Sequence, residues 1–109
     1  MYFESCVKSA EKFVRAELPL LTGKKDRLVY MLASSWYIYL VLGRDFITPS
    51  FAIRLASMHL AESMVNVQRS VYRDCEKLGY SPTDLINKFI SYRIERSGIY
   101  GYTKNNKEG

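Results

Sequence analysis

Prolines and glycines divide this 109-residue chain into four long stretches, each with the periodicity of a helix rather than of a strand. Proline is tolerated in the first turn of a helix but breaks its interior, and glycine readily closes a helix in the left-handed conformation. The dividing residues are Pro19, Gly23, Gly43, Pro49, Gly79 and Pro82. No stretch alternates with period two over a useful length. The sequence therefore predicts an all-α protein of four helices.

The first two predicted helices differ in how their apolar residues are distributed. Residues 2–18 place apolar side chains at three-and-four spacing with charged residues opposite, which is typical of an amphipathic helix. Residues 24–42 are apolar on nearly every side. Because a helix in a bundle normally keeps one side in water, we expect the surplus apolar face to be covered by the C-terminal tail, a loop or a partner chain.

The third predicted helix is the longest, and the fourth follows it after a short turn. Thr48 and Pro49 provide a hydroxyl cap and a proline at the first helical position, and the pattern continues without interruption to Leu78. The fourth helix begins with the cap of Ser81 and runs to about Arg96. The expected core residues of the third helix are Ile53, Leu60, Met64, Val67, Val71, Cys75 and Leu78.

Short turns between helices favour antiparallel neighbours, which predicts a single-domain four-helix up-and-down bundle. This domain spans residues 1–97, and residues 98–109 form a flexible tail rich in tyrosine, glycine and lysine. The uncharged run from Leu28 to Leu42 would reach about 22 Å as a helix, short of the roughly 30 Å hydrocarbon core of a bilayer. We therefore expect no membrane partner.

The net charge is +5, and it is spread thinly over the chain. Such a surplus favours an anionic partner, although it also serves solubility. Cys6 and Cys75 are too few for a disulfide framework and lack zinc-site spacing, so both are predicted to be buried reduced thiols. Residues 1–4 lack the features of a signal peptide, which favours a cytoplasmic location.

Cations cluster in three places. One short cluster on the first predicted helix, of Lys8, Lys12 and Arg15, is partly offset by Glu4 and Glu11. The other two suit a polyanion better. Arg69, Arg73 and Lys77 stand every fourth residue along the predicted solvent side of the third helix. A second cluster interleaves cations with tyrosines, the combination that an unstacked strand would use. Its members are Lys88, Tyr92, Arg93, Arg96, Tyr100, Tyr102 and Lys104. The favoured prediction is a binding protein for nucleic acid or a nucleoprotein complex, although cations in a last helical turn also stabilise the helix dipole without any ligand.

Aromatic residues on the second predicted helix support another class of function. They are Tyr30, Trp36, Tyr37 and Tyr39. Aromatic side chains are enriched where proteins meet, so this helix could form a homodimer or adaptor interface. The alternative is a core helix whose tyrosine hydroxyls reach the surface.

The chain has one histidine, His59, which follows Arg54 by five residues. This Arg-x-x-x-x-His pattern resembles the catalytic signature of the HEPN family of small helical-bundle ribonucleases. The resemblance implies a metal-independent ribonuclease in which His59 performs acid-base chemistry on the RNA 2′-hydroxyl and Arg54 stabilises phosphate charge. Within a regular helix the two residues would point about 140° apart, and Leu55 stands where the family has a polar residue. The ribonuclease is therefore an alternative to a non-enzymatic protein.

His59 and Glu62 are also one helical turn apart, but both are predicted on the solvent side, without the inward carboxylates of a bundle metal site. We expect neither a metal nor a cofactor.

Overall fold

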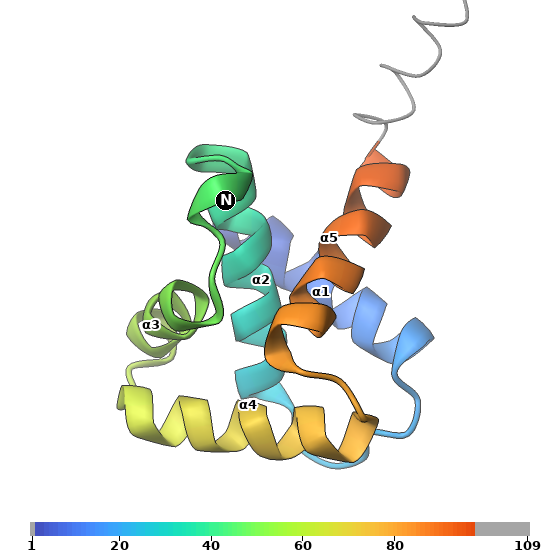
Figure 1. The fold of residues 1–109 in the computed structure, drawn as a ribbon, viewed down its shortest axis with the longest axis vertical. Helices are drawn as coiled ribbons and strands as arrows, with labels where there is room; N and C mark the ends of the chain where they lie inside the picture. Colours follow the sequence, from blue (N-terminus) through green and yellow to red (C-terminus); the bar gives the residue numbers. More distant parts are fainter. Residues whose placement is uncertain (1, 98–109) are drawn as a thin grey trace, which may run out of the picture.

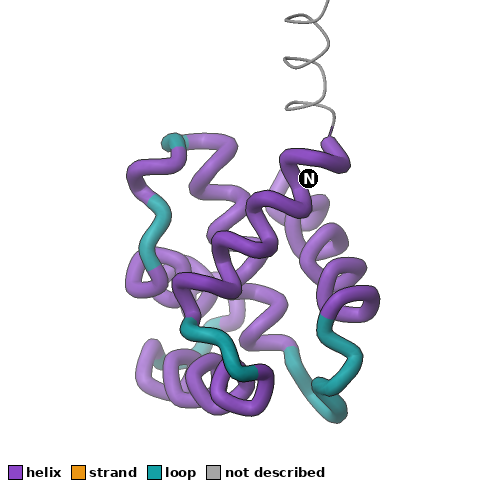
Figure 2. Tube along the Cα trace, turned by 45° about the vertical axis from the view of Figure 1, so that its right-hand side comes forward, coloured by secondary structure: helices purple, strands orange, loops and turns teal. Residues whose placement is uncertain are grey.

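The computed structural model describes residues 2–97, and every regular element in that range is a helix (Figure 1). Figure 2 shows these helices in purple, joined by short loops. Their bounds are α1 Tyr2–Glu17, α2 Asp26–Val41, the 3-10 helix η1 Arg44–Phe46, α3 Pro49–Leu60, α4 Met64–Leu78 and α5 Pro82–Ser97. The predicted all-α class is confirmed. The described residues form five α-helices rather than four.

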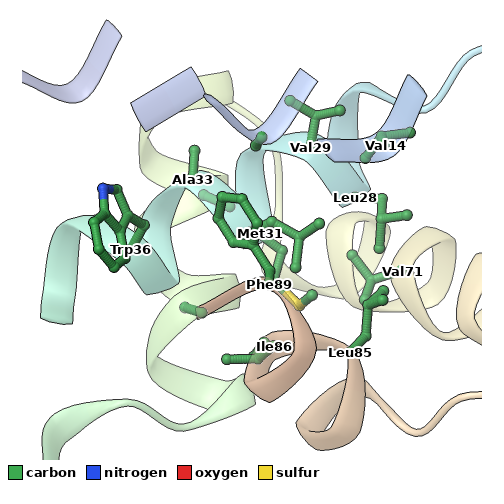
Figure 3. Packing of buried hydrophobic residues seen from close by; sticks show 14 of the residues in the cluster. Val14, Leu28, Val29, Met31, Ala33, Trp36, Val71, Leu85, Ile86 and Phe89 are labelled. Carbon is green, nitrogen blue, oxygen red and sulfur yellow. The ribbon is translucent and has the colours of Figure 1, made fainter. Parts of the chain in front are cut away.

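Helix α2 lies at the centre of the fold. The helices α1, α3, α4 and α5 and the 3-10 helix all pack against it. Every residue from Met31 to Trp36 is buried, which requires neighbours on all sides of the helix. Figure 3 shows Val14 of α1 and Val71 of α4 in the same core as side chains of α2 and α5. Most of the surplus apolar face is thus covered by the chain's own helices, although Val41 at the end of α2 is 51% exposed. The sequence analysis did not predict this cover.

The prediction of one continuous helix from residue 49 to residue 78 is wrong. Helix α3 ends at Leu60, and Ala61 adopts the left-handed conformation with φ of 55°. The Ser63 hydroxyl then caps α4 by accepting a hydrogen bond from the Asn66 backbone N–H at 3.2 Å. The apolar pattern hides this break because the core positions of both helices keep the same helical spacing.

An ion pair ties the turn between α3 and α4 to the start of α2. The Arg27 guanidinium donates from Nε and from a terminal nitrogen to the two carboxylate oxygens of Glu62, each at 2.8 Å. This bidentate contact holds the pKa of Glu62 below its usual range. The turn therefore has a tertiary anchor as well as a local cap.

The break changes the architecture that was predicted. In Figure 1, α4 lies across the lower end of the molecule, while the coils of α3 are seen nearly end-on, so the two helices cross steeply. A regular up-and-down bundle would instead place every helix alongside its neighbours. The fold is an all-helical structure with a crossing helix at one end.

The helix ends predicted from local sequence signals agree better with the structure than the predicted bundle does. The caps predicted at Thr48 and Ser81 both form, since their hydroxyls accept hydrogen bonds from the backbone N–H groups of Phe51 and Asp84 at 3.1 Å and 3.0 Å. Helix α2 begins two residues later than expected, at Asp26. Most of the expected core residues are buried or half-buried, but Met64 is 38% exposed at the start of α4.

Cys6 and Cys75 are both unpaired and buried, as predicted. Burial raises the pKa of each thiol to about 11. None of the helices in residues 2–97 has the length and apolarity that crossing a membrane requires. The predicted tail, with Tyr100, Tyr102 and Lys104, lies outside the described residues.

Candidate nucleic-acid interface

Helix α4 turns one side to the core and the other to solvent. Val67, Val71 and Cys75 are buried. Arg69 and Arg73 lie on the opposite side and are exposed. Because the break at Ala61 precedes Arg69, the three predicted cations remain on one uninterrupted helix, and Lys77 is exposed one turn beyond Arg73.

Two shallow hollows run along this exposed side. The larger, of about 520 Å³, is bordered by Arg69, Tyr72, Arg73 and Glu76, together with Tyr80 from the turn before α5 and Pro82, the first residue of α5. A second hollow continues towards the start of α4 and shares Arg69 and Tyr72 with the first. We call the exposed side of α4 that carries Val65, Asn66, Gln68, Arg69, Tyr72, Arg73, Glu76 and Lys77 the outer face of α4.

Tyr72 and Val65 are parts of this face that the sequence analysis missed. Tyr72 is 47% exposed and Val65 is 61% exposed. The available signal was their position on the helical wheel, about 100° and 120° from the buried Val71. A residue at such an angle sits at the edge of the core stripe, and only the packing of neighbouring helices decides whether it is covered.

The cations of the outer face are not neutralised by ion pairs. Within residues 2–97, no carboxylate forms a salt bridge with Arg69, Arg73 or Lys77. Arg73 and Lys77 act electrostatically on Asp74, which is half-buried on the same helix.

The environment of Asp74 also reveals a fourth cation near α4. Burial raises the pKa of Asp74, and the positive charges of Lys77, Arg73 and Lys25 partly oppose that rise. Lys25 comes from the loop between α1 and α2, where its ammonium donates a hydrogen bond to the Leu21 carbonyl at 2.9 Å. The positive charge beside α4 therefore includes a residue that is distant in sequence.

The cations of α5 are arranged differently. Lys88 lies over the Tyr80 ring at 6.0 Å, Arg93 over Trp36 at 5.4 Å and Arg96 over Tyr92 at 3.9 Å. Such cation-π contacts hold the charged end of each side chain over its ring. Arg93 is half-buried, and its Nε is buried without a hydrogen-bond partner among the described residues.

Within residues 2–97, the cation clusters predicted on α4 and α5 do not merge. In Figure 1, α4 lies at the lower end of the molecule, whereas the last turns of α5, which carry Arg93 and Arg96, lie towards its upper end. Lys88 lies over the ring of Tyr80, and Tyr80 also borders the larger hollow beside α4. Among the described cations of α5, Lys88 is therefore placed near α4.

The aromatic residues predicted as a protein interface make contacts within the chain. Tyr30 and Tyr37 pack against Phe3 of α1, with ring centroids 5.9 Å and 5.8 Å apart. Trp36 stacks on Tyr39 at 5.2 Å and is only 4% exposed, so its ring is not presented at the surface. These contacts account for the aromatic character of α2 without a partner.

The structure does not bring Arg54 and His59 together into one site. The His59 ring stacks on Phe3, with centroids 3.7 Å apart and planes 5° from parallel. Arg54 borders a separate hollow with Thr48, Ser50 and Phe51 at the start of α3.

Glu62, which the sequence pairs with His59 as a possible metal ligand, is instead bound by Arg27. In the described part of the chain, no three histidine, cysteine, aspartate or glutamate side chains gather as a metal site would require.

No protein family, curated protein or solved structure matches this chain. The interpretation of the α4 surface therefore depends on its own residues, charges and exposure.

Proposed function

We propose that this protein binds nucleic acid through the outer face of α4, as a binding protein rather than an enzyme. The observation that carries the proposal is the pair of exposed arginines, Arg69 and Arg73, which border one hollow and form no salt bridge within residues 2–97. An exposed guanidinium without a carboxylate partner keeps its hydrogen-bond donors available to a phosphate.

The spacing of the cations suits a row of phosphates. Residues four apart on a helix are neighbours, with Cβ atoms about 5–6 Å apart. Arg69, Arg73 and Lys77 therefore form a line over two turns, and Lys25 adds charge beside its end. Each phosphate that such cations neutralise releases counterions, which makes binding stronger at low salt.

The outer face of α4 is better suited to this role than the cations of α5. Lys88, Arg93 and Arg96 already lie over aromatic rings of the same chain. A ligand would have to bind beside those contacts or displace them. The proposal is accordingly narrower than the sequence prediction, which included both helices.

The test measures the affinity for a labelled oligonucleotide at a series of salt concentrations. Fluorescence anisotropy reports the binding. We expect binding that weakens as salt rises, and we expect Arg69→Gln and Arg73→Gln each to weaken it. Each substitution should also lower the slope of log affinity against log salt by about 1, the change expected for one lost phosphate contact.

Arg96→Gln is the matched control, because it removes the same charge from the last turn of α5. It should leave the salt slope nearly unchanged. The proposal fails if the wild-type protein shows no binding at low salt, if its binding does not depend on salt, or if Arg96→Gln is as damaging as Arg69→Gln.

A further inference from the structure

Helices α3 and α4 have the geometry of a helix-turn-helix unit. They are joined by three residues, Ala61, Glu62 and Ser63, and they cross steeply (Figure 1). Two helices at a large angle, connected by a turn of three or four residues, form the motif that places its second helix in the major groove of DNA. The left-handed Ala61 and the capping Ser63 make the turn sharp.

The unit is supported from behind by α2. The helices α2, α3 and α4 all pack against one another, and the ion pair of Arg27 with Glu62 fixes the turn to the first turn of α2. Ser57 and Val67, on the inner sides of α3 and α4, are 5% and 0% exposed. The inner side of α4 is thus held, while its outer side remains open along its length.

The outer face of α4 carries the side-chain types that read base edges. Asn66 and Arg69 are exposed and stand three residues apart, so they lie on the same side of the helix. Arginine binds the O6 and N7 atoms of guanine, asparagine binds the N6 and N7 atoms of adenine, and an apolar side chain such as Val65 suits the thymine methyl group.

We infer that α4 is a recognition helix for double-stranded DNA, with Asn66 and Arg69 directed at base edges and Arg73 and Lys77 at phosphates. This inference rests on the proposed function and names its ligand class. A B-form major groove admits an α-helix, whereas the deep, narrow major groove of an RNA duplex does not. The ligand is therefore duplex DNA rather than duplex RNA.

The exposed Tyr72 ring supports a competing interpretation, in which α4 binds single-stranded nucleic acid. An exposed ring between two arginines also suits the stacked bases of a single strand. The ring lies at the edge of the outer face, about 60° from Arg69 on the helical wheel, whereas Arg69 and Arg73 are the residues farthest from the core. The placement favours polar and cationic groups at the centre of the contact and the ring at its margin.

The first experiment compares three labelled probes of equal length and matched sequence: duplex DNA, duplex RNA and single-stranded DNA. We expect duplex DNA to bind most tightly at moderate salt. Tighter binding of the single strand, with a loss of about tenfold or more in Tyr72→Ala that Tyr72→Phe restores, would overturn the inference and leave the proposed function standing. Equal binding of both duplexes would also overturn it. Absence of binding to all three probes would instead remove the proposed function.

The second experiment selects preferred sites from a random duplex-DNA library. We expect the wild-type protein to enrich a short preferred site, and Asn66→Ala and Arg69→Ala each to relax the preference at one position by about five- to hundredfold. Asn87→Ala on α5 is the matched control, because Asn87 is equally an exposed helical asparagine, and it should leave the enriched site unchanged. Failure of Asn66→Ala and Arg69→Ala to alter the preference would contradict the assignment of α4 as the recognition helix.

Discussion

Helices α4 and α5 each carry three cations on their described surfaces, but they use them in opposite ways. Each of Lys88, Arg93 and Arg96 on α5 lies over an aromatic ring of the same chain. The three cations of α4 have no such ring contact and no salt bridge within the described residues, and the neighbouring Tyr72 ring is exposed. Equal counts of cations in a sequence therefore do not mean equal availability to a ligand.

The cause of this difference is the surroundings of each helix. Helix α5 packs against α1 and α2. Its cations lie over one ring from α2, one from α5 itself and one from the turn before α5. Helix α4 crosses the end of the fold, and the residues of its outer face are exposed. The cations of α5 therefore have a structural role, and we propose a ligand-binding role for those of α4.

The largest effect should come from removing the ring beneath Arg93. Trp36→Ala deletes a nearly fully buried indole and should lower the free energy of unfolding by about 3–5 kcal/mol. Tyr72→Ala, in contrast, removes an exposed ring and should change it by no more than about 1 kcal/mol. Urea unfolding followed by circular dichroism measures both. Similar losses for the two variants would contradict the division between the helices.

The next comparison uses one substitution at two positions. Arg73→Gln should weaken DNA binding by about fivefold, on the order of 1 kcal/mol, and leave stability nearly unchanged, because the side chain is exposed and forms no salt bridge with any residue from 2 to 97. Arg93→Gln should leave binding nearly unchanged and lower the unfolding free energy by about 1 kcal/mol, since it loses its contact with Trp36. Fluorescence anisotropy measures DNA binding by both variants, and urea unfolding measures their stability. Weaker binding by Arg93→Gln would show that α5 also contacts the ligand.

The turn that lays α4 across the fold can be tested through Ala61. A left-handed backbone is unfavourable for alanine and costs glycine nothing, so Ala61→Gly should raise the unfolding free energy by about 1 kcal/mol. Glycine in place of Glu11, an exposed residue in the interior of α1, should instead lower it by about 0.5–1 kcal/mol. Thermal or urea unfolding of the two variants provides the measurement, and a loss of stability in Ala61→Gly would be inconsistent with the turn described.

The smallest effect concerns Asp74, the half-buried carboxylate beside Arg73, Lys77 and Lys25. Because burial raises its pKa, the folded protein holds this proton at a higher pH than the unfolded chain does. Its contribution to stability is therefore present at acidic pH and is lost as pH rises through the folded-state pKa.

Replacing the Asp74 carboxylate with a neutral amide should remove the decrease in stability that its ionisation causes at neutral pH. Asp74→Asn should raise the unfolding free energy at pH 7 by up to about 0.5 kcal/mol and strengthen DNA binding slightly, by removing a negative charge beside the outer face of α4. Asp45→Asn changes the net charge equally on the exposed 3-10 helix and should not affect binding. Weaker binding by Asp74→Asn would contradict this view of the surface.

Much of the fold could be predicted because the signals are local. The caps at Thr48 and Ser81, and the closures of helices before Gly43 and Gly79, depend on residues within one turn of each other. The break at Ala61 could not be predicted from periodicity, because the core positions of α3 and α4 fit one continuous wheel. A serine cap at Ser63 was the available signal, but the Arg27 partner of Glu62 lies 35 residues away in sequence.

The candidate site divides in the same way. The spacing of Arg69, Arg73 and Lys77 is a property of the sequence and is unchanged by the break. The exposure of Tyr72 and the cover over Arg93 depend on which helices lie beside them, and so does the position of Lys25 near α4.

The helical class, the ends of most helices and the line of cations on α4 follow from the local sequence, because hydrogen bonds within a helix and the 3.6-residue repeat depend on near neighbours. Packing between distant segments sets the rest: the other helices enclose α2, the chain turns at Ala61, and α4 crosses the end of the fold with its cations exposed. Those features depend on contacts between residues distant along the chain, which no local pattern encodes.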